Sequence, residues 1–239
     1  MPERCRTVLL FCMEKRMIEL IDFQKQYKHN TIYEPTNTVF PGNSISFLMG
    51  KNGCGKTTLM KCIGMLENYG GSILFDKQPL PAVRNQCMII WDDTPCCQNL
   101  SGFQNLMLLS EDKCSKKEVR QTGEHYLKHS VLNRKVKTYS YGQRKKLMLA
   151  LADLLKPKYL LMDEISNGLD ADMMDELAAH LNSMKQHCTI ILTGHQFGFY
   201  EKVAEHVFVK GKTTVTEVPP EECAAGSLEE IYHAYTAQT

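Results

Sequence analysis

The feature that most constrains this chain is a glycine-rich segment, which reads Gly50-Lys51-Asn52-Gly53-Cys54-Gly55-Lys56-Thr57-Thr58. It matches the phosphate-loop pattern G-x-x-x-x-G-K-[ST] at every fixed position. The apolar run 44–49 before it predicts a buried strand, and apolar residues recur at helical spacing from Lys56 onward. The glycines let successive backbone N–H groups converge at a helix N-terminus, which favours anions. The segment therefore predicts a nucleoside triphosphate site, with Lys56 on the β- and γ-phosphates and Thr57 as a Mg²⁺ ligand.

A second apolar run supplies the carboxylates that such a site needs. Tyr159–Met162 predicts a buried strand, and Asp163 and Glu164 follow it directly. Asp163 fits the Walker B role of holding Mg²⁺, and Glu164 is positioned to polarise an attacking water. Alone, this pattern is weak, because acids often follow a strand at the start of a helix. Together with the phosphate loop it predicts an ATP- and Mg²⁺-dependent site.

Strand and helix patterns alternate along most of the chain. The further predicted strands are 17–23, 72–75, 88–91 and Thr189–Thr193, and a helix is predicted over 171–186. This alternation indicates a mainly parallel sheet covered by helices on both faces. Between residues 94 and 155 strand patterns disappear and helical periodicity dominates, so this stretch is interpreted as a helical insert.

Composition excludes several classes of protein. The 239 residues carry 28 Lys and Arg against 27 Asp and Glu, a net charge of +1, so a nucleic-acid partner is not expected. No apolar stretch approaches the roughly 20 residues of a membrane-spanning helix. The ten cysteines include no C-x-x-C pair, which favours free structural thiols over a zinc or redox site.

Further motifs resemble the nucleotide-binding subunits of ATP-binding-cassette (ABC) transporters. Tyr139-Ser140-Tyr141-Gly142-Gln143 stands where that family has its L-S-G-G-Q signature, and Asp163 follows Gln143 by 20 residues. Asp170 ends a segment similar to the D-loop, and His195 follows the strand Thr189–Thr193 at the place of the switch histidine. Tyr27, 23 residues before Gly50, matches the aromatic residue that stacks on adenine, with Tyr33 and Phe23 as alternatives.

The resemblance implies a fold and a domain division. The fold is an α/β P-loop NTPase (RecA-like) core with a mainly parallel sheet, an N-terminal antiparallel β part and an inserted helical subdomain. Residues 17–239 are expected to form one ABC ATPase domain, in which 17–93 and 156–239 are the core and 94–155 the helical subdomain. Residues 1–16 are expected to be a loose extension.

The resemblance also implies the roles of individual residues. Glu164, His195 and Lys56 are the expected catalytic residues, and Thr57, Asp163 and Asp93 the expected Mg²⁺ ligands. The expected ATP contacts are Tyr27, Gly50, Asn52, Gly53, Cys54, Gly55, Lys56, Thr57, Thr58, Asp93, Ser140, Gly142, Gln143 and Asp170. The chain departs from the family pattern at Tyr139, Tyr141, Asp93 (for the usual glutamine) and Ile165 (for the usual proline).

The implied partners are a second ATP-binding subunit, in a homo- or heterodimer, and a membrane-spanning subunit. The chain would then lie at the cytoplasmic face of the plasma membrane. The segment 95–103 would touch the membrane subunit through Cys96, Cys97, Leu100 and Phe103. An interior loop is an equally good interpretation of this segment. The stretch 227–232 resembles the end of compact exporter-type subunits, and together with the Y-S-x-G form of the signature this resemblance favours an exporter. The alternatives are a soluble ABC-superfamily ATPase acting on DNA or ribosomes, and a small-molecule P-loop kinase.

Overall fold

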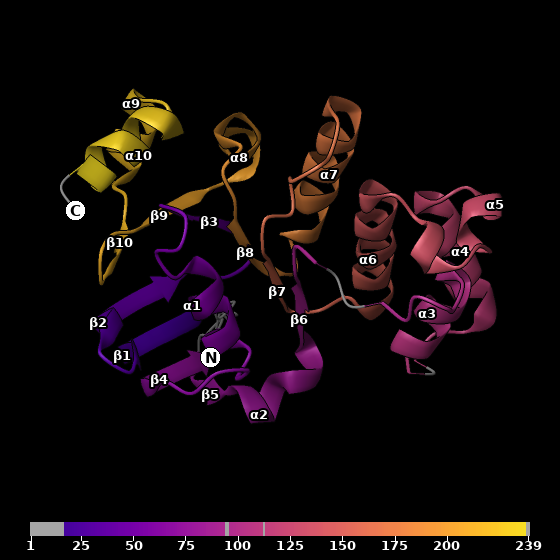
Figure 1. Ribbon diagram of the computed structural model, residues 1–239, viewed down its shortest axis with the longest axis horizontal. Helices are drawn as coiled ribbons and strands as arrows, with labels where there is room; N and C mark the ends of the chain where they lie inside the picture. The colour runs from indigo at the N-terminus through magenta and orange to yellow at the C-terminus, as the bar shows by residue number, and fades with distance from the viewer. Residues whose placement is uncertain (1–16, 94–95, 112, 238–239) are drawn as a thin grey trace, which may run out of the picture.

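The computed structural model describes residues 17–93, 96–111 and 113–237. The extension predicted at 1–16 lies outside the described residues. The chain folds into a six-stranded and a four-stranded sheet, with helices packed around them (Figure 1). Helices of the middle of the chain gather at one end, and the antiparallel sheet lies at the other.

The six-stranded sheet carries the phosphate loop and has the order β10-β9-β3-β8-β7-β6. Its strands are β3 (Ile45–Gly50), β6 (Cys87–Ile90), β7 (Tyr159–Met162), β8 (Thr189–Thr193), β9 (His206–Lys210) and β10 (Val215–Glu217). Neighbouring strands from β9 to β6 are parallel, and β10 pairs with β9 antiparallel. Their carboxyl ends therefore lie along one edge, where α/β proteins place ligands.

The four-stranded sheet is antiparallel and has the order β2-β1-β4-β5. Its strands are β1 (Ile18–Tyr27), β2 (Asn30–Phe40), β4 (Gly70–Phe75) and β5 (Gln78–Pro79). In β1 the residues Ile18, Leu20 and Phe23 are buried, whereas Ile21 is 40% exposed, so one face of this sheet meets the core. This is the pattern expected when an antiparallel sheet is solvated on one side.

Both faces of the parallel sheet are buried, because side chains alternate between two hydrophobic clusters. In β7, Leu160 and Met162 pack into a cluster with the outer helices, and Leu161 packs into a cluster with the antiparallel sheet. In the first cluster Phe47 stacks on Tyr200, with ring centres 4.0 Å apart. Continuous apolar strands of this kind are expected where helices and a second sheet cover both faces.

The helices confirm the expected α/β class. They are α1 (Lys56–Ile63), α2 (Leu80–Val83), α3 (Gly102–Leu109), α4 (Lys116–Tyr126), α5 (His129–Leu132), α6 (Tyr141–Leu155), α7 (Ala171–Met184), α8 (Phe197–Val203), α9 (Pro220–Ala225) and α10 (Leu228–Ala237). Short 3₁₀ turns lie at Arg84–Gln86 and Val136–Thr138. Within 94–155 the described residues contain α3 to α6 and no strand.

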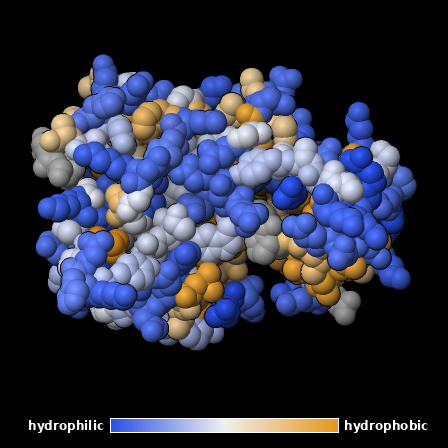
Figure 2. Space-filling view, viewed as in Figure 1, coloured by the Kyte–Doolittle hydropathy of each residue, from blue (hydrophilic) through white to orange (hydrophobic). Residues whose placement is uncertain are grey.

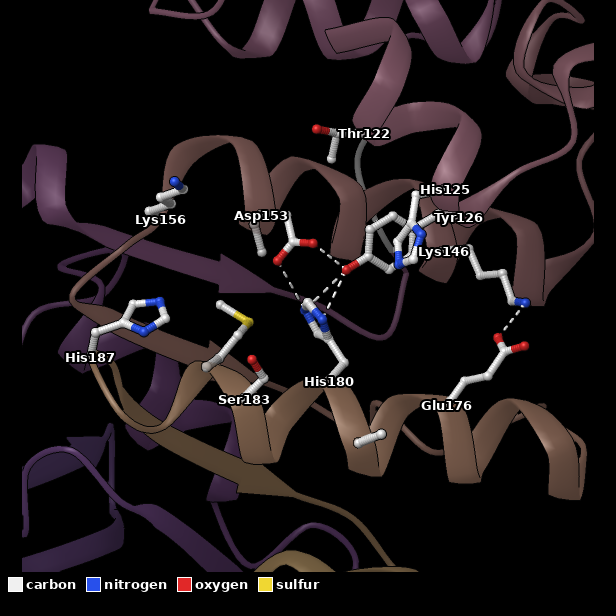
Figure 3. A pocket seen from close by; sticks show the side chains of 13 residues that line it. Thr122, His125, Tyr126, Lys146, Asp153, Lys156, Glu176, His180, Ser183 and His187 are labelled. Atoms are coloured by element: carbon white, nitrogen blue, oxygen red, sulfur yellow. Dashed lines mark hydrogen bonds and ion pairs between the residues drawn. The ribbon is translucent and has the colours of Figure 1, made fainter. Parts of the chain in front are cut away.

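A cleft of about 720 Å³ separates α4 and α6 from α7 (Figure 3). Inside it the Tyr126 hydroxyl lies 2.5 Å from an Asp153 carboxylate oxygen and 2.8 Å from Nδ1 of His180. At the other end of the cleft, Lys146 of α6 forms an ion pair of 2.6 Å with Glu176 of α7. Polar contacts therefore join the helical segment to the core across this gap.

The surface is mostly polar on the face seen in Figure 2, with apolar side chains gathered near α2 and over α3. None of the helices among the described residues has the length and apolarity to cross a membrane. The eight cysteines of the described part are free thiols, as the absence of C-x-x-C pairs predicts. Cys5 and Cys12 lie outside the described residues.

Candidate functional site

The phosphate loop links the end of β3 to the start of α1. Gly53 and Gly55 have φ values of +76° and +116°, which glycine adopts with little strain. A Cβ on Gly55 would lie 2.5 Å from Cγ2 of Ile32, so this position also lacks room for a side chain. The buried Tyr33 donates a 2.9 Å hydrogen bond to the Gly55 carbonyl. Ile32 and Tyr33 of β2, in the antiparallel sheet, thus pack against the phosphate loop.

Lys56 is the first residue of α1 and is buried, 6% exposed. Its Nζ donates to the carbonyls of Gly50, at 2.8 Å, and Lys51, at 3.3 Å. The same Nζ lies 3.3 Å from Nε2 of His195. The lysine charge is therefore held inside the loop, next to the histidine that follows β8.

Thr57 and Asp163 meet across the site, although they are 106 residues apart. The Thr57 hydroxyl donates a 2.9 Å hydrogen bond to one oxygen of Asp163. Thr193, at the end of β8, donates a 2.5 Å hydrogen bond to the other oxygen. Both Asp163 oxygens are thus oriented. Thr193 was missed by the sequence reasoning, although its place just before Gly194 and His195 is a usable signal.

Glu164 has a strained backbone and an unsatisfied carboxylate. Its φ is +50°, and its N–H donates to Thr193. One carboxylate oxygen lies 3.3 Å from Nε2 of His195, whereas the other is buried without a hydrogen-bond partner. Burial raises the pKa of Glu164, and Lys56 partly offsets this effect. Burial and Lys56 lower the pKa of His195. The pair therefore combines a basic carboxylate with a neutral imidazole.

Oxygen ligands suited to Mg²⁺ come together at this point. Mg²⁺ in nucleotide sites is usually bound through one or two protein oxygens, phosphates and waters. The Thr57 hydroxyl and the Asp163 carboxylate, in direct contact, provide such a set. The residues present therefore fit the ion that the phosphate-loop pattern implies. Among the described residues, no cluster of three or more His, Cys, Asp or Glu side chains forms a metal cage of protein ligands alone.

The signature residues lie at the start of α6, away from the contacts just described. Ser140 is the N-cap of α6 and forms a capping box with Gln143. Its hydroxyl accepts from the Gln143 N–H at 3.3 Å, and the Gln143 side chain accepts from the Ser140 N–H at 3.1 Å. A serine hydroxyl can donate while it accepts. The side-chain hydrogen bonds of Ser140 and Gln143 in the described part of the chain are with each other and with Arg134, and none reaches the phosphate loop of the same chain.

The other predicted ATP contacts lie in three places. Asp170 caps α7 by accepting from the Met173 N–H at 2.9 Å. Tyr27 is 41% exposed at the end of β1, where its hydroxyl bonds to Glu67. The rival aromatic residues Tyr33 and Phe23 are buried, so neither has a ring face open for stacking. In the phosphate loop, Asn52 and Gly53 are exposed, and Cys54 and Thr58 are half-buried.

Two carboxylates follow β6: Asp93, which is predicted to contact ATP and Mg²⁺, and Asp92, which contacts α6 and was not predicted. Asp93 is exposed. Asp92 accepts from the Tyr141 hydroxyl and lies 3.4 Å from Nζ of Lys145. The sequence signal for this contact is that Tyr141 and Lys145 are four residues apart on one helical face.

The family follows from comparison with known proteins. A family model described as ABC transporter matches residues 34–167, more than half of the chain. The chain belongs to the ABC transporter family. Among curated ABC relatives, the lantibiotic transport ATP-binding protein SrtF of Streptococcus pyogenes is 27% identical over 91% of this chain and 96% of its own length.

Other ABC relatives are longer than this chain. The spermidine/putrescine import ATP-binding protein PotA of Mycoplasma mycoides subsp. mycoides SC is 27% identical over 92% of the chain, which spans 64% of PotA. The sulfate/thiosulfate import ATP-binding protein CysA of Neisseria meningitidis serogroup B is 30% identical over 90% of the chain, which spans 62% of CysA. The chain thus matches ATP-binding proteins of the ABC family, whose members hydrolyse ATP for transport.

Solved structures agree with the fold of ABC ATP-binding subunits. A structure of the ATP binding subunit of an ABC transporter superposes with a TM-score of 0.83 at 22% identity, covering 92% of this chain and 99% of that one. The cbiO1 protein of Clostridium perfringens, part of the transporter complex cbiONQ, superposes with a TM-score of 0.74 at 22% identity, covering 92% and 98%.

Proposed function

We propose that this chain binds and hydrolyses ATP as a pair of subunits and thereby powers transport through a membrane partner. One observation carries the proposal: Lys56, His195 and Glu164 form one chain of contacts at the carboxyl edge of the parallel sheet. Thr57, Asp163 and Thr193 form a second chain at the same edge. Together they provide a cation, a metal-ligand pair and a base beside a loop of backbone N–H groups.

In this proposal the phosphate loop and Lys56 bind the triphosphate. The N–H groups from Gly50 to Thr58, including those of Asn52 and Cys54, surround the phosphates at the N-terminus of α1. Lys56 exchanges its carbonyl contacts for the β- and γ-phosphates. Thr57 and Asp163 hold Mg²⁺, with Asp93 as a further proposed ligand. The bound ion neutralises phosphate charge. Tyr27 stacks on adenine.

Glu164 is the proposed base. Its unpartnered buried oxygen accepts a hydrogen bond from the attacking water, and its raised pKa makes the carboxylate a stronger base. His195, held between Lys56 and Glu164, orients the γ-phosphate and the water. The strained φ of Glu164 is stabilised by two acceptors on Thr193, which keeps the carboxylate turned towards the site.

We propose that two subunits complete each site. Within one chain the signature residues Ser140, Gly142 and Gln143 do not contact the phosphate loop, so they are available to the ATP of a second subunit. The N-terminus of α6 and the Ser140 hydroxyl then add donors for the γ-phosphate. Asp170 links the two sites across the dimer. Hydrolysis removes the shared γ-phosphate and releases the pair.

The proposed domain division follows the same logic. Residues 17–93 and 156–239 form the core that binds the nucleotide, and 94–155 form the helical subdomain that presents the signature. The absence of strands from the described part of 94–155 supports this division. The whole of 17–239 acts as one ATPase domain.

A membrane-spanning subunit is the proposed second partner, and the chain lies at the cytoplasmic face of the plasma membrane through it. Two features support the contact. Within the predicted segment 95–103, Cys97 is exposed, and Leu108, which follows the segment in α3, is 53% exposed. Pro95 of this segment lies outside the described residues. An apolar groove of about 240 Å³ is lined by Ile63, Gly64, Leu66, Phe75, Leu80, Arg84, Cys87, Ile89, Trp91 and Leu161. Cys96 and Phe103 instead pack against the core.

Export is the direction that we propose to test. The similarity to the lantibiotic transport ATP-binding protein SrtF, over 96% of the length of SrtF, supports this direction. The glutamine transport ATP-binding protein GlnQ of Bacillus subtilis is also similar, over 95% of its length, so import is the alternative outcome of the test. We propose no nucleic-acid partner, because the net charge of +1 leaves no basic excess.

The proposal is tested with the purified chain and MgATP. Phosphate release should rise more steeply than linearly with protein concentration, because two subunits build each site. Co-purification should recover a membrane protein. A linear rate would contradict the dimer. Recovery of nucleic acid or ribosomes would favour the soluble ABC ATPase, and a phosphorylated small molecule would favour a kinase.

A further inference from the structure

A polar cluster at the edge of the site ties α6, which begins at the signature residues, to the segment that carries Glu164 in the same chain. Tyr141 and Lys145 lie one turn apart on α6, and Lys145 is 1% exposed. Both side chains contact the same carboxylate oxygen of Asp92, which follows β6. Lys145 also donates to the backbone carbonyl of Glu164 at 3.3 Å. One face of α6 is therefore bonded to the ends of both β6 and β7.

The ring of Tyr141 adds a packing contact to this cluster. It lies against Gly168, where φ is +66° and a Cβ would come within 2.7 Å of the ring. Nζ of Lys145 lies 5.0 Å from the centre of the same ring. Tyr141 therefore contacts the segments after β6 and β7 at once. A glycine at this position, as in the family signature, has no side chain to make either contact.

Charge is balanced within the cluster. Burial lowers the pKa of Lys145, and Asp92 opposes that effect. Burial and the Asp92 carboxylate raise the pKa of Tyr141, so its hydroxyl remains a donor. A buried lysine without its carboxylate would be costly. Tyr141 and Lys145 therefore share one carboxylate partner, Asp92.

We propose that Tyr141, Asp92 and Lys145 are positioning residues that couple the two ATP sites of the dimer. The inference rests on the proposed function. In such a dimer, Ser140 serves the ATP of the partner, whereas Glu164 serves the ATP of its own chain. The cluster joins these two ends of one chain through side-chain contacts. Binding at one site then orders the base of the other through α6.

The experiment compares two matched variants in the full chain. Tyr141→Phe removes the hydroxyl that bonds to Asp92 and keeps the ring against Gly168. Tyr139→Phe removes a hydroxyl that donates to the Val131 carbonyl at 2.7 Å and bonds to the Gly102 backbone, both within the helical segment 94–155. Rates of phosphate release are measured against ATP concentration for both, together with thermal unfolding. Asp92→Asn, which keeps an acceptor but removes the charge, provides a second perturbation.

We expect Tyr141→Phe to lose the ATP cooperativity of the wild type, that is, the change of at least about fivefold in ATP affinity at one site when the other is filled, which is the lower end of usual site-to-site coupling. Asp92→Asn should do the same, and the double variant should be no worse than either single one. Tyr139→Phe should keep the ATP cooperativity of the wild type, although it should lower the unfolding temperature by about as much as Tyr141→Phe does. If Tyr141→Phe and Tyr139→Phe behave alike, or if a well-folded Asp92→Asn protein keeps its cooperativity, the coupling is refuted. A wild type without ATP-dependent dimerisation would instead refute the proposed function.

Discussion

Replacing Glu164 by glutamine tests the proposed base most directly. The change keeps the shape of the side chain and an oxygen for the contact with His195, which is 3.3 Å in the wild type. It removes the ability of the buried second oxygen to accept a proton from water. A positioned general base contributes about 10²- to 10⁴-fold to a rate, which corresponds to about 3–5 kcal/mol of barrier. Burial raises the pKa of Glu164, which makes the carboxylate a stronger base, so we expect a loss within this range.

The assay measures phosphate release at saturating MgATP, with ATP binding and dimer formation measured separately. Glu164→Gln should bind ATP, hydrolyse it very slowly and accumulate as a dimer. Glu176→Gln is the matched control, because Glu176 is 66% exposed on α7 and pairs with Lys146 away from the phosphate loop. Its turnover should equal that of the wild type. Turnover of Glu164→Gln within about twofold of the wild type would refute the assignment of a general base.

Stability provides an independent check on the same residue. Because the folded pKa of Glu164 is raised, the folded state binds more protons than the unfolded chain above the ordinary glutamate pKa. The free energy of unfolding therefore falls as the pH rises through this range, because Glu164 ionises less readily in the folded state than in the unfolded chain. Neutral glutamine removes that loss, so the variant should unfold at a higher temperature at pH 7. A lower unfolding temperature would show that the buried charge is better compensated than this reasoning assumes.

The remaining predictions concern three other parts of the molecule. Ser140→Arg should abolish ATP-dependent dimerisation, measured by size-exclusion chromatography, while each chain stays folded; unchanged dimerisation would overturn the signature assignment. Gly55→Ala should lower the free energy of unfolding by about 1–3 kcal/mol and weaken ATP binding, because φ is +116° and a Cβ has no room. Gly53→Ala, where a Cβ would lie in open space, should lower the free energy of thermal unfolding by less. Burial lowers the pKa of His180 in the cleft of Figure 3. Asp153 opposes this shift, and His125 lowers the pKa further. The unfolded chain then binds more protons below a pH of about 6.5, so stability should fall as the pH drops below that value. His180→Gln should flatten the unfolding free energy in this window, and an unchanged slope would contradict the prediction.

The sequence alone was sufficient for the parts of this protein that depend on local pattern. The glycine spacing from Gly50 to Thr57 requires a tight loop before a helix, and that loop is observed between β3 and α1. The strands Tyr159–Met162 and Thr189–Thr193 were predicted at their observed bounds, because each contains a short apolar run and is buried along its whole length. The fold class followed from their alternation with helices.

Strands with mixed composition escaped prediction. β2 contains Pro35 and several polar residues, and β10 is only three residues long, so neither shows a clear period of two. β2 is held by its pairing with β1, and β10 by its pairing with β9. Such pairing depends on neighbours that are distant in sequence, and a local pattern does not reveal it.

Motifs name the chemistry of this site, and tertiary structure decides which atoms meet. The sequence marked Lys56, Asp163, Glu164 and His195 as separate signals, each at the end of a strand or the start of a helix. Only the order of β3, β8 and β7 in the sheet brings His195 within hydrogen-bonding distance of Lys56 and Glu164, and Asp163 within that distance of Thr57 and Thr193, since strands adjacent in space are far apart in the chain. The contact of Asp92 with α6 likewise depends on how α6 packs against the ends of β6 and β7. Local sequence therefore determined the functional groups, and the register of the sheet and the packing of α6 determined their partners.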